Sequence, residues 1–70
     1  MPRYEAAIFN QVVAREVQEG LAPRQLDAGW AETRYIEISA TNDLDARRKF
    51  EARYPSQRGY VIQNISQISD

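Results

Sequence analysis

The segment from Asn42 to Pro55 constrains the fold of this chain most strongly, because it predicts a helix over about 42–54. Residue types that favour the N-cap position of a helix open the segment, at Thr41, Asn42 and Asp43. Its apolar residues recur every four positions and so share one helix face, at Ala46, Phe50 and Tyr54. Pro55 ends the helix, because a proline biases the preceding residue away from helical backbone angles.

Two β-prone runs flank this helix. The first covers Ala31–Ala40 and alternates apolar with polar residues, and Trp30 is expected to open this strand. The second covers Gly59–Ile65 and is rich in residues that favour strands. Val61 and Ile62 are adjacent and break the alternation, which favours a central strand buried on both faces.

The N-terminal third has a less decided pattern. A strand over 4–9 followed by a short helix over 11–19 is the preferred interpretation. Asn10 is then placed to cap that helix, and Gly20 stands just past its end, where a left-handed residue is common. Two alternatives remain open at this point, namely one amphipathic helix over 3–19 or one long strand over 3–18.

Taken together, these patterns predict a single small α+β domain over 1–70. Residues 20–29 are expected to form a loop, because they include glycine and proline without apolar periodicity. The predicted architecture is a small three-stranded sheet packed by one long helix over about 42–54, with a short second helix over about 11–19.

The small size of the domain indicates that another chain completes its core. A compact 70-residue chain buries only about 60% of the surface that it exposes when unfolded. A three-stranded sheet also leaves strand edges unpaired. We therefore expect a homo-oligomer or a protein partner, with Trp30, Leu21 and Leu26 as candidate partner-binding residues, since tryptophan is enriched at interface hot spots.

The composition argues against several chemistries. The chain contains no Cys and no His, so disulfides, thiol catalysis and the commonest general base are excluded. We expect no catalytic residues, no cofactor and no metal site, and therefore no enzyme. No apolar run approaches the roughly 18 residues of a membrane span, and the first residues lack a signal-peptide core. We therefore expect a cytoplasmic location and no membrane partner.

A basic and aromatic segment over 47–60 supports one alternative function, a small nucleic-acid-binding module. Cations contact phosphate and aromatic faces stack on bases at such sites. The residues that would contact nucleic acid are Arg47, Arg48, Lys49, Arg53, Arg58 and Tyr60. The chain as a whole has a net charge of −1, and helical geometry points these cations in different directions. The leading hypothesis is therefore a small non-catalytic interaction or accessory protein.

Overall fold

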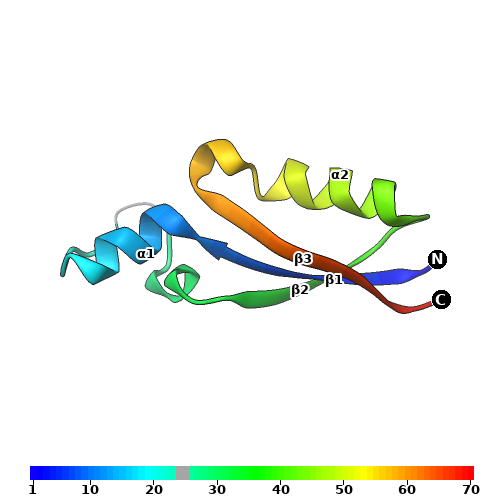
Figure 1. Ribbon diagram of the computed structural model, residues 1–70, viewed down its shortest axis with the longest axis horizontal. Helices are drawn as coiled ribbons and strands as arrows, with labels where there is room; N and C mark the ends of the chain where they lie inside the picture. Colours follow the sequence, from blue (N-terminus) through cyan, green and yellow to red (C-terminus); the bar gives the residue numbers. More distant parts are fainter. Residues whose placement is uncertain (24–25) are drawn as a thin grey trace.

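The computed structural model describes residues 1–23 and 26–70, and it contains a three-stranded antiparallel sheet in the order β2-β1-β3 (Figure 1). The elements in chain order are β1 (Arg3–Asn10), α1 (Gln11–Gln18), the 3-10 helix η1 (Ala28–Ala31), β2 (Arg34–Ser39), α2 (Asp43–Arg53), the 3-10 helix η2 (Ser56–Arg58) and β3 (Tyr60–Ser69). The predicted α+β class and three-stranded sheet are confirmed, and each helix ends within one residue of its predicted bounds. Residues 24 and 25 of the expected loop lie outside the described residues.

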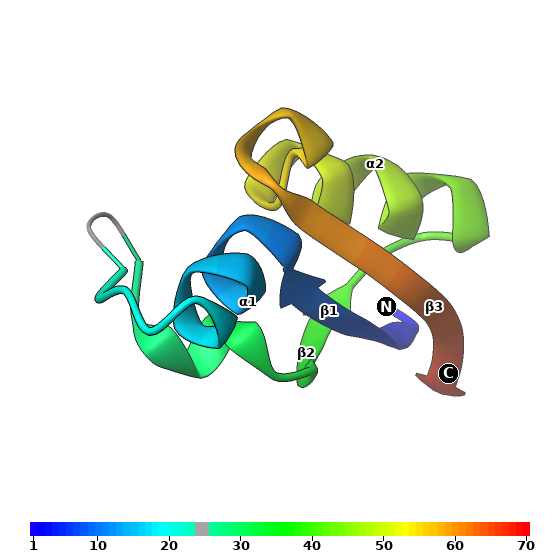
Figure 2. The ribbon, with the colours of Figure 1, turned by 60° about the vertical axis from the view of Figure 1, so that its left-hand side comes forward.

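The sheet is built around β1, which pairs antiparallel with both neighbours. Helix α2 lies along one face of the sheet, whereas α1 continues beyond the end of β1 and packs against η1 (Figures 1 and 2). Every second side chain of β1 is buried, the first three of them in one core with α2, and Phe50 of α2 is the largest fully buried side chain. The core consists of Tyr4, Ala6, Ile8, Ile38, Ala40, Ala46 and Phe50. The opposite face is more polar, as is common for an antiparallel sheet with one solvated side.

Asn10 decides the structure of the N-terminal third in favour of a strand followed by a helix. Its side chain is fully buried, and its Oδ1 accepts hydrogen bonds from the backbone N–H groups of Val12 and Val13, at 3.0 and 3.1 Å. Its Nδ2 donates to the carbonyl oxygen of Arg58, at 3.0 Å. The predicted N-cap is thus confirmed, and it also joins the start of α1 to the turn before β3.

Gly20 ends α1 as the sequence predicts. Its φ of 78° is left-handed, which costs glycine little. The N–H of Gly20 donates to the carbonyl of Val17 at 3.0 Å, and that of Leu21 donates to the carbonyl of Glu16 at 2.8 Å. This pair of bonds is the Schellman arrangement, which satisfies the last carbonyls of the helix.

The prediction that Val61 and Ile62 belong to a central strand is wrong, because β3 is an edge strand. A register shift in the β1–β3 pairing leaves Gln63 without a partner on β1, so β3 carries a bulge there. Ile62 pairs with Ile8 on the core face, whereas Val61 pairs with Phe9 on the opposite face. The strand also runs on to Ser69, beyond its predicted end.

Trp30 does not open a strand, as was expected, but lies in η1. Asp27 sets this turn: its Oδ1 accepts from the N–H of Gly29 at 2.7 Å, and its carbonyl accepts from the N–H of Trp30 at 3.0 Å. Local capping by an aspartate therefore outweighs the alternation that placed Trp30 in the strand. Strand β2 begins only at Arg34.

The molecule is elongated for its length. Its principal extents are 42 × 19 × 15 Å, and its radius of gyration is 13.1 Å, whereas a compact domain of 70 residues has about 11 Å. Its accessible surface is 4908 Å², against about 4,500 Å² for a typical folded chain of this mass. A single chain therefore leaves more of its surface in water than its size requires.

Candidate protein-interaction edge at β3

The outer edge of β3 is open and carries no charge. The ten residues Tyr60–Ser69 contain no Asp, Glu, Lys, Arg or Pro. Edge strands normally carry such residues, because their unpaired N–H and C=O groups otherwise invite another strand to pair. The opposite edge strand, β2, carries Arg34 and Glu37, and Lys49 Nζ donates to the carbonyl oxygen of its last residue, Ser39, at 3.0 Å. Of the two edges, β3 is therefore the better template for strand addition.

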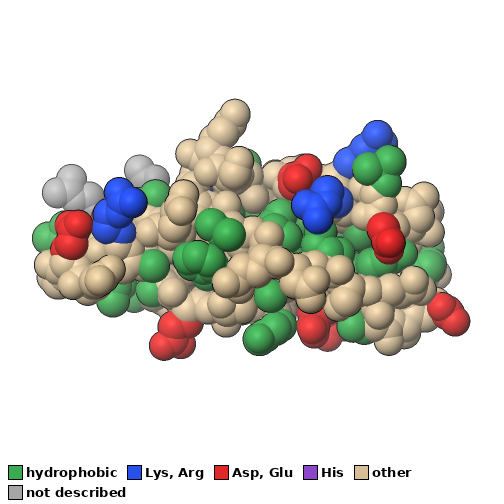
Figure 3. Space-filling view, in the orientation of Figure 1, with side chains coloured by type: hydrophobic (Ala, Val, Ile, Leu, Met, Phe, Trp, Pro, Cys, Tyr) green, Lys and Arg blue, Asp and Glu red, His purple; other side chains and the backbone are tan. Residues whose placement is uncertain are grey.

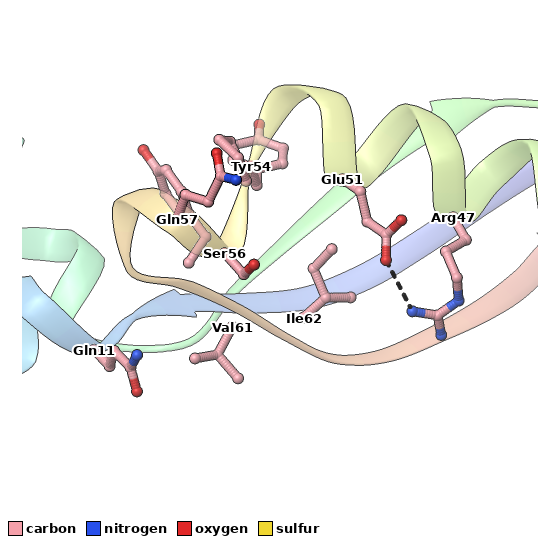
Figure 4. A pocket seen from close by; sticks show the side chains of 10 residues that line it. Gln11, Arg47, Glu51, Tyr54, Ser56, Gln57, Val61 and Ile62 are labelled. Carbon is pink, nitrogen blue, oxygen red and sulfur yellow. Dashed lines mark ion pairs between the residues drawn. The ribbon is translucent and has the colours of Figure 1, made fainter.

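A groove of about 660 Å³ lies beside this edge, between α2, η2 and β3 (Figure 4). Arg47 and Glu51 extend from successive turns of α2 on its wall, and their side chains pair at 3.7 Å. Ile62 of β3 points toward this pair, whereas Val61 borders the groove from the other side of the strand. A strand added to β3 would thus find both backbone partners and space for the side chains that point toward α2.

A cluster of three aromatic rings, two of which line the groove, holds the end of α2 against β3. The ring centroids of Trp30, Tyr54 and Tyr60 lie 5.2–5.5 Å apart, in tilted or edge-to-face arrangements. Such pairs add about 0.5–1.5 kcal/mol beyond the area they bury. Arg34 also stacks over the Trp30 ring, with its guanidinium carbon 4.8 Å from the centroid. The end of α2 is therefore fixed over the beginning of β3.

A second set of polar contacts fixes the other end of α2. Asn42 Oδ1 accepts from the N–H of Asp45 at 2.8 Å, as an N-cap does. Asp45 Oδ2 accepts in turn from the N–H of Thr41 at 2.9 Å, and it lies 3.4 Å from Lys49 Nζ. The hydrogen bond from Thr41, with smaller contributions from Lys49, lowers the pKa of the Asp45 carboxyl below its usual value of 3.8. With both ends held, the Arg47–Glu51 flank keeps its position beside β3.

The predicted partner-binding residues differ in their exposure to solvent. Trp30 is half-buried in the aromatic cluster and packs against the core. Leu26 is also half-buried, whereas Leu21 is 56% exposed at the end of α1. Their role in partner binding stays a prediction.

The predicted nucleic-acid residues do not form one stripe. Arg47 faces the groove at β3, whereas Lys49 reaches β2 on the other flank of α2. Tyr60 packs within the aromatic cluster. The remaining three residues of this set are exposed, namely Arg48, Arg53 and Arg58. Basic and acidic side chains are interspersed on the face shown in Figure 3.

The sequence reasoning missed the β3 edge and the Arg47–Glu51 flank. The signal for the edge was present, because the run Gly59–Ser69 has no charged residue. Its meaning depends on strand order, which places β3 at the outside of the sheet. The ion pair of Arg47 with Glu51 belongs to the site only because α2 lies beside β3, and this contact joins segments that are distant in the sequence.

Comparisons with known proteins do not assign the site. No protein-family model matches the chain, and neither a curated protein nor a solved structure is significantly similar to it. Within residues 1–23 and 26–70, no three His, Cys, Asp or Glu side chains gather as a metal site would require. No helix in the same part of the chain has the length and apolar character needed to cross a membrane.

Proposed function

We propose that this chain is a small non-catalytic interaction protein, cytoplasmic in location, that pairs the outer edge of β3 with a strand from another protein chain. The observation that carries the proposal is the ten-residue, charge-free edge strand with a groove beside it. In strand addition, backbone hydrogen bonds supply affinity, and pockets for alternate side chains supply specificity. A non-catalytic role is proposed because the chain lacks both Cys and His.

A matched pair of lysine variants tests this proposal. Asn64 of β3 and Tyr35 of β2 both pair with Ala7, so they flank the same residue on opposite edges of the sheet. Both side chains are exposed, and neither belongs to the buried core. Asn64→Lys therefore adds a charge at the proposed edge, and Tyr35→Lys adds the same charge at the other edge.

The experiment uses the tagged full-length chain as bait, with retained proteins quantified by mass spectrometry. Untagged copies of the chain are included as one prey. We expect the wild-type chain and Tyr35→Lys to retain the same protein and Asn64→Lys to lose it. A partner that is lost with Tyr35→Lys but kept by Asn64→Lys would overturn the proposal, because it would place the interface away from β3.

A further inference from the structure

We propose that the strand added to β3 is the β3 strand of a second copy of this chain, paired antiparallel about a twofold axis between Gln63 and Asn64. This inference rests on the function proposed above and names its partner. The two three-stranded sheets would join into one continuous sheet. Such an interface is isologous, so each residue contacts the symmetric position of the other copy.

The bulge in β3 sets the register of this pairing. Cross-strand partners must lie on the same face of a sheet. The core face carries Tyr60, Ile62, Ile65 and Gln67, because these residues pair with the buried side of β1. The opposite face carries Val61, Asn64 and Ser66, which pair with Phe9, Ala7 and Glu5. Thr33 directly precedes Arg34, which pairs with Ile8 of the core face, so alternation puts Thr33 on the opposite face. Because Thr33 Oγ1 donates to Gln63 Oε1 at 3.0 Å, we assign Gln63 to that face as well.

Counted outward from the bond between residues 63 and 64, the side chains therefore lie on the same series of faces toward residue 60 and toward residue 67, namely opposite, core, opposite and core. In a regular strand, a register centred on a bond would pair side chains from opposite faces. With the bulge, this register pairs Ile62 with Ile65 of the second copy, both on the core face. Both isoleucines are half-buried in the single chain, so the pairing would extend the core across the axis.

The absence of charge makes self-pairing permissible. Around a twofold axis, a charged residue near the axis meets its own copy, and like charges opposite each other are destabilising. None of the ten residues of β3 carries a charge. The single chain also exposes about 400 Å² more than a typical folded chain of its mass, which is roughly half of the 800 Å² per partner in a standard interface, so strand pairing has to bury ordinary surface as well.

The charges on α2 are complementary to a second copy. Tyr54 at the end of α2 contacts Tyr60 at the start of β3, and the two elements are antiparallel (Figure 1). Residues before Tyr54 therefore lie beside residues after Tyr60. The point midway between Arg47 and Glu51 lies five residues before Tyr54, or about 7.5 Å along the helix. That length corresponds to about two residues of strand, which places the midpoint beside Ile62, one to two residues before the proposed axis. The two α2 helices would run antiparallel on the same side of the joined sheet, so the Arg47–Glu51 flanks of the two copies, each with both signs of charge, approach each other near the axis.

Cysteine cross-linking tests this arrangement, because the chain has no cysteine of its own. In the proposed dimer, the two Asn64 Cα atoms lie on the same face, diagonally across the axis, at about 6 Å, which a disulfide can span. Under mild oxidation, Asn64→Cys is expected to form a disulfide-linked dimer. The control is Tyr35→Cys, which is expected to stay largely monomeric under the same conditions because it lies on the outer edge.

Molar mass by light scattering across a concentration series provides the second readout. We expect the wild-type chain to reach twice the monomer mass, and Asn64→Lys to raise the dimer Kd by about tenfold or more while its circular dichroism stays unchanged. Arg47→Glu and Glu51→Arg should each weaken the dimer, and the double exchange should restore it.

Two outcomes would overturn the inference. The first is a wild-type chain that stays monomeric up to about millimolar concentration, where a dimer would be stabilised by only about 4 kcal/mol. The second is a dimer that cross-links through Tyr35→Cys rather than Asn64→Cys. A monomeric chain that still loses a different protein partner through Asn64→Lys would overturn self-pairing alone and leave the proposed function standing.

Discussion

Gly59 joins the turn before β3 to the start of α1, and we expect Gly59→Ala to be strongly destabilising. Its φ of 96° lies in the left-handed region, where a residue with a side chain loses about 1–2 kcal/mol. A Cβ at this position would also lie 2.7 Å from both Asn10 Oδ1 and Val12 Cγ2. Displacing the Asn10 cap adds about 1 kcal/mol. The expected loss is therefore about 2–3 kcal/mol in the free energy of unfolding.

Gly20→Ala is the matched control for this prediction. Gly20 has a φ of 78°, but no atom lies within 4 Å of the position of its missing Cβ. It therefore carries the conformational cost of about 1–2 kcal/mol without the steric one. For a domain of 70 residues, whose total stability is about 4–10 kcal/mol, the difference between the two variants is measurable.

Urea unfolding followed by circular dichroism measures both variants, and thermal unfolding provides a second scale of about 4–8 °C per kcal/mol. A double-mutant cycle with Asn10→Ala identifies the contact: the penalty of Gly59→Ala should shrink once the Asn10 side chain is gone. Equal losses in Gly59→Ala and Gly20→Ala would refute the reasoning, since backbone conformation alone would then account for the effect.

Three further predictions concern Trp30, Asp45 and the nucleic-acid alternative. Trp30→Ala should lower the free energy of unfolding by about 2–4 kcal/mol, because it removes two of the three ring contacts in the aromatic cluster and the packing of Trp30 against the core; unchanged stability in urea would indicate a purely surface role. The lowered pKa of Asp45 means that its contribution to stability is present above the unfolded pKa and is lost as pH falls through the folded pKa, below 3.8. The stability difference between wild type and Asp45→Asn should therefore shrink in that acidic range, and a constant difference down to pH 2 would contradict it. Fluorescence anisotropy with single-stranded oligonucleotides at low salt should show no tight binding; salt-sensitive binding weakened by Arg48→Glu and Lys49→Glu would support the nucleic-acid alternative.

Local signals in the sequence account for most of the secondary structure. Asn10 and Asn42 cap the two helices, and Gly20 and Gly59 adopt the left-handed conformations expected after a helix and at the end of a turn. Pro55 follows directly on the residue that caps the end of α2. These features depend on neighbours within about four residues, so a pattern along the chain can reveal them.

The features that define the candidate site depend instead on contacts between distant segments. The bulge at Gln63 arises from the pairing of β3 with β1, and the adjacent Val61 and Ile62 do not distinguish a bulged edge strand from a buried central one. Trp30 meets Tyr60 only because η1 folds back over the beginning of β3. Strand order, which makes β3 an edge, cannot be obtained from periodicity alone.

The distribution of charge between the two edges also explains why assembly through β3 would stop at two copies. A twofold pairing of β3 with β3 uses the open edge of both chains, and the outermost strands of the joined sheet are then the two β2 strands. β2 carries Arg34 and Glu37, and the carbonyl of Ser39 already accepts a hydrogen bond from Lys49. Charges on an edge discourage further strand addition. An unprotected β3 beside a protected β2 is thus the arrangement that permits one closed pairing and resists an open-ended sheet.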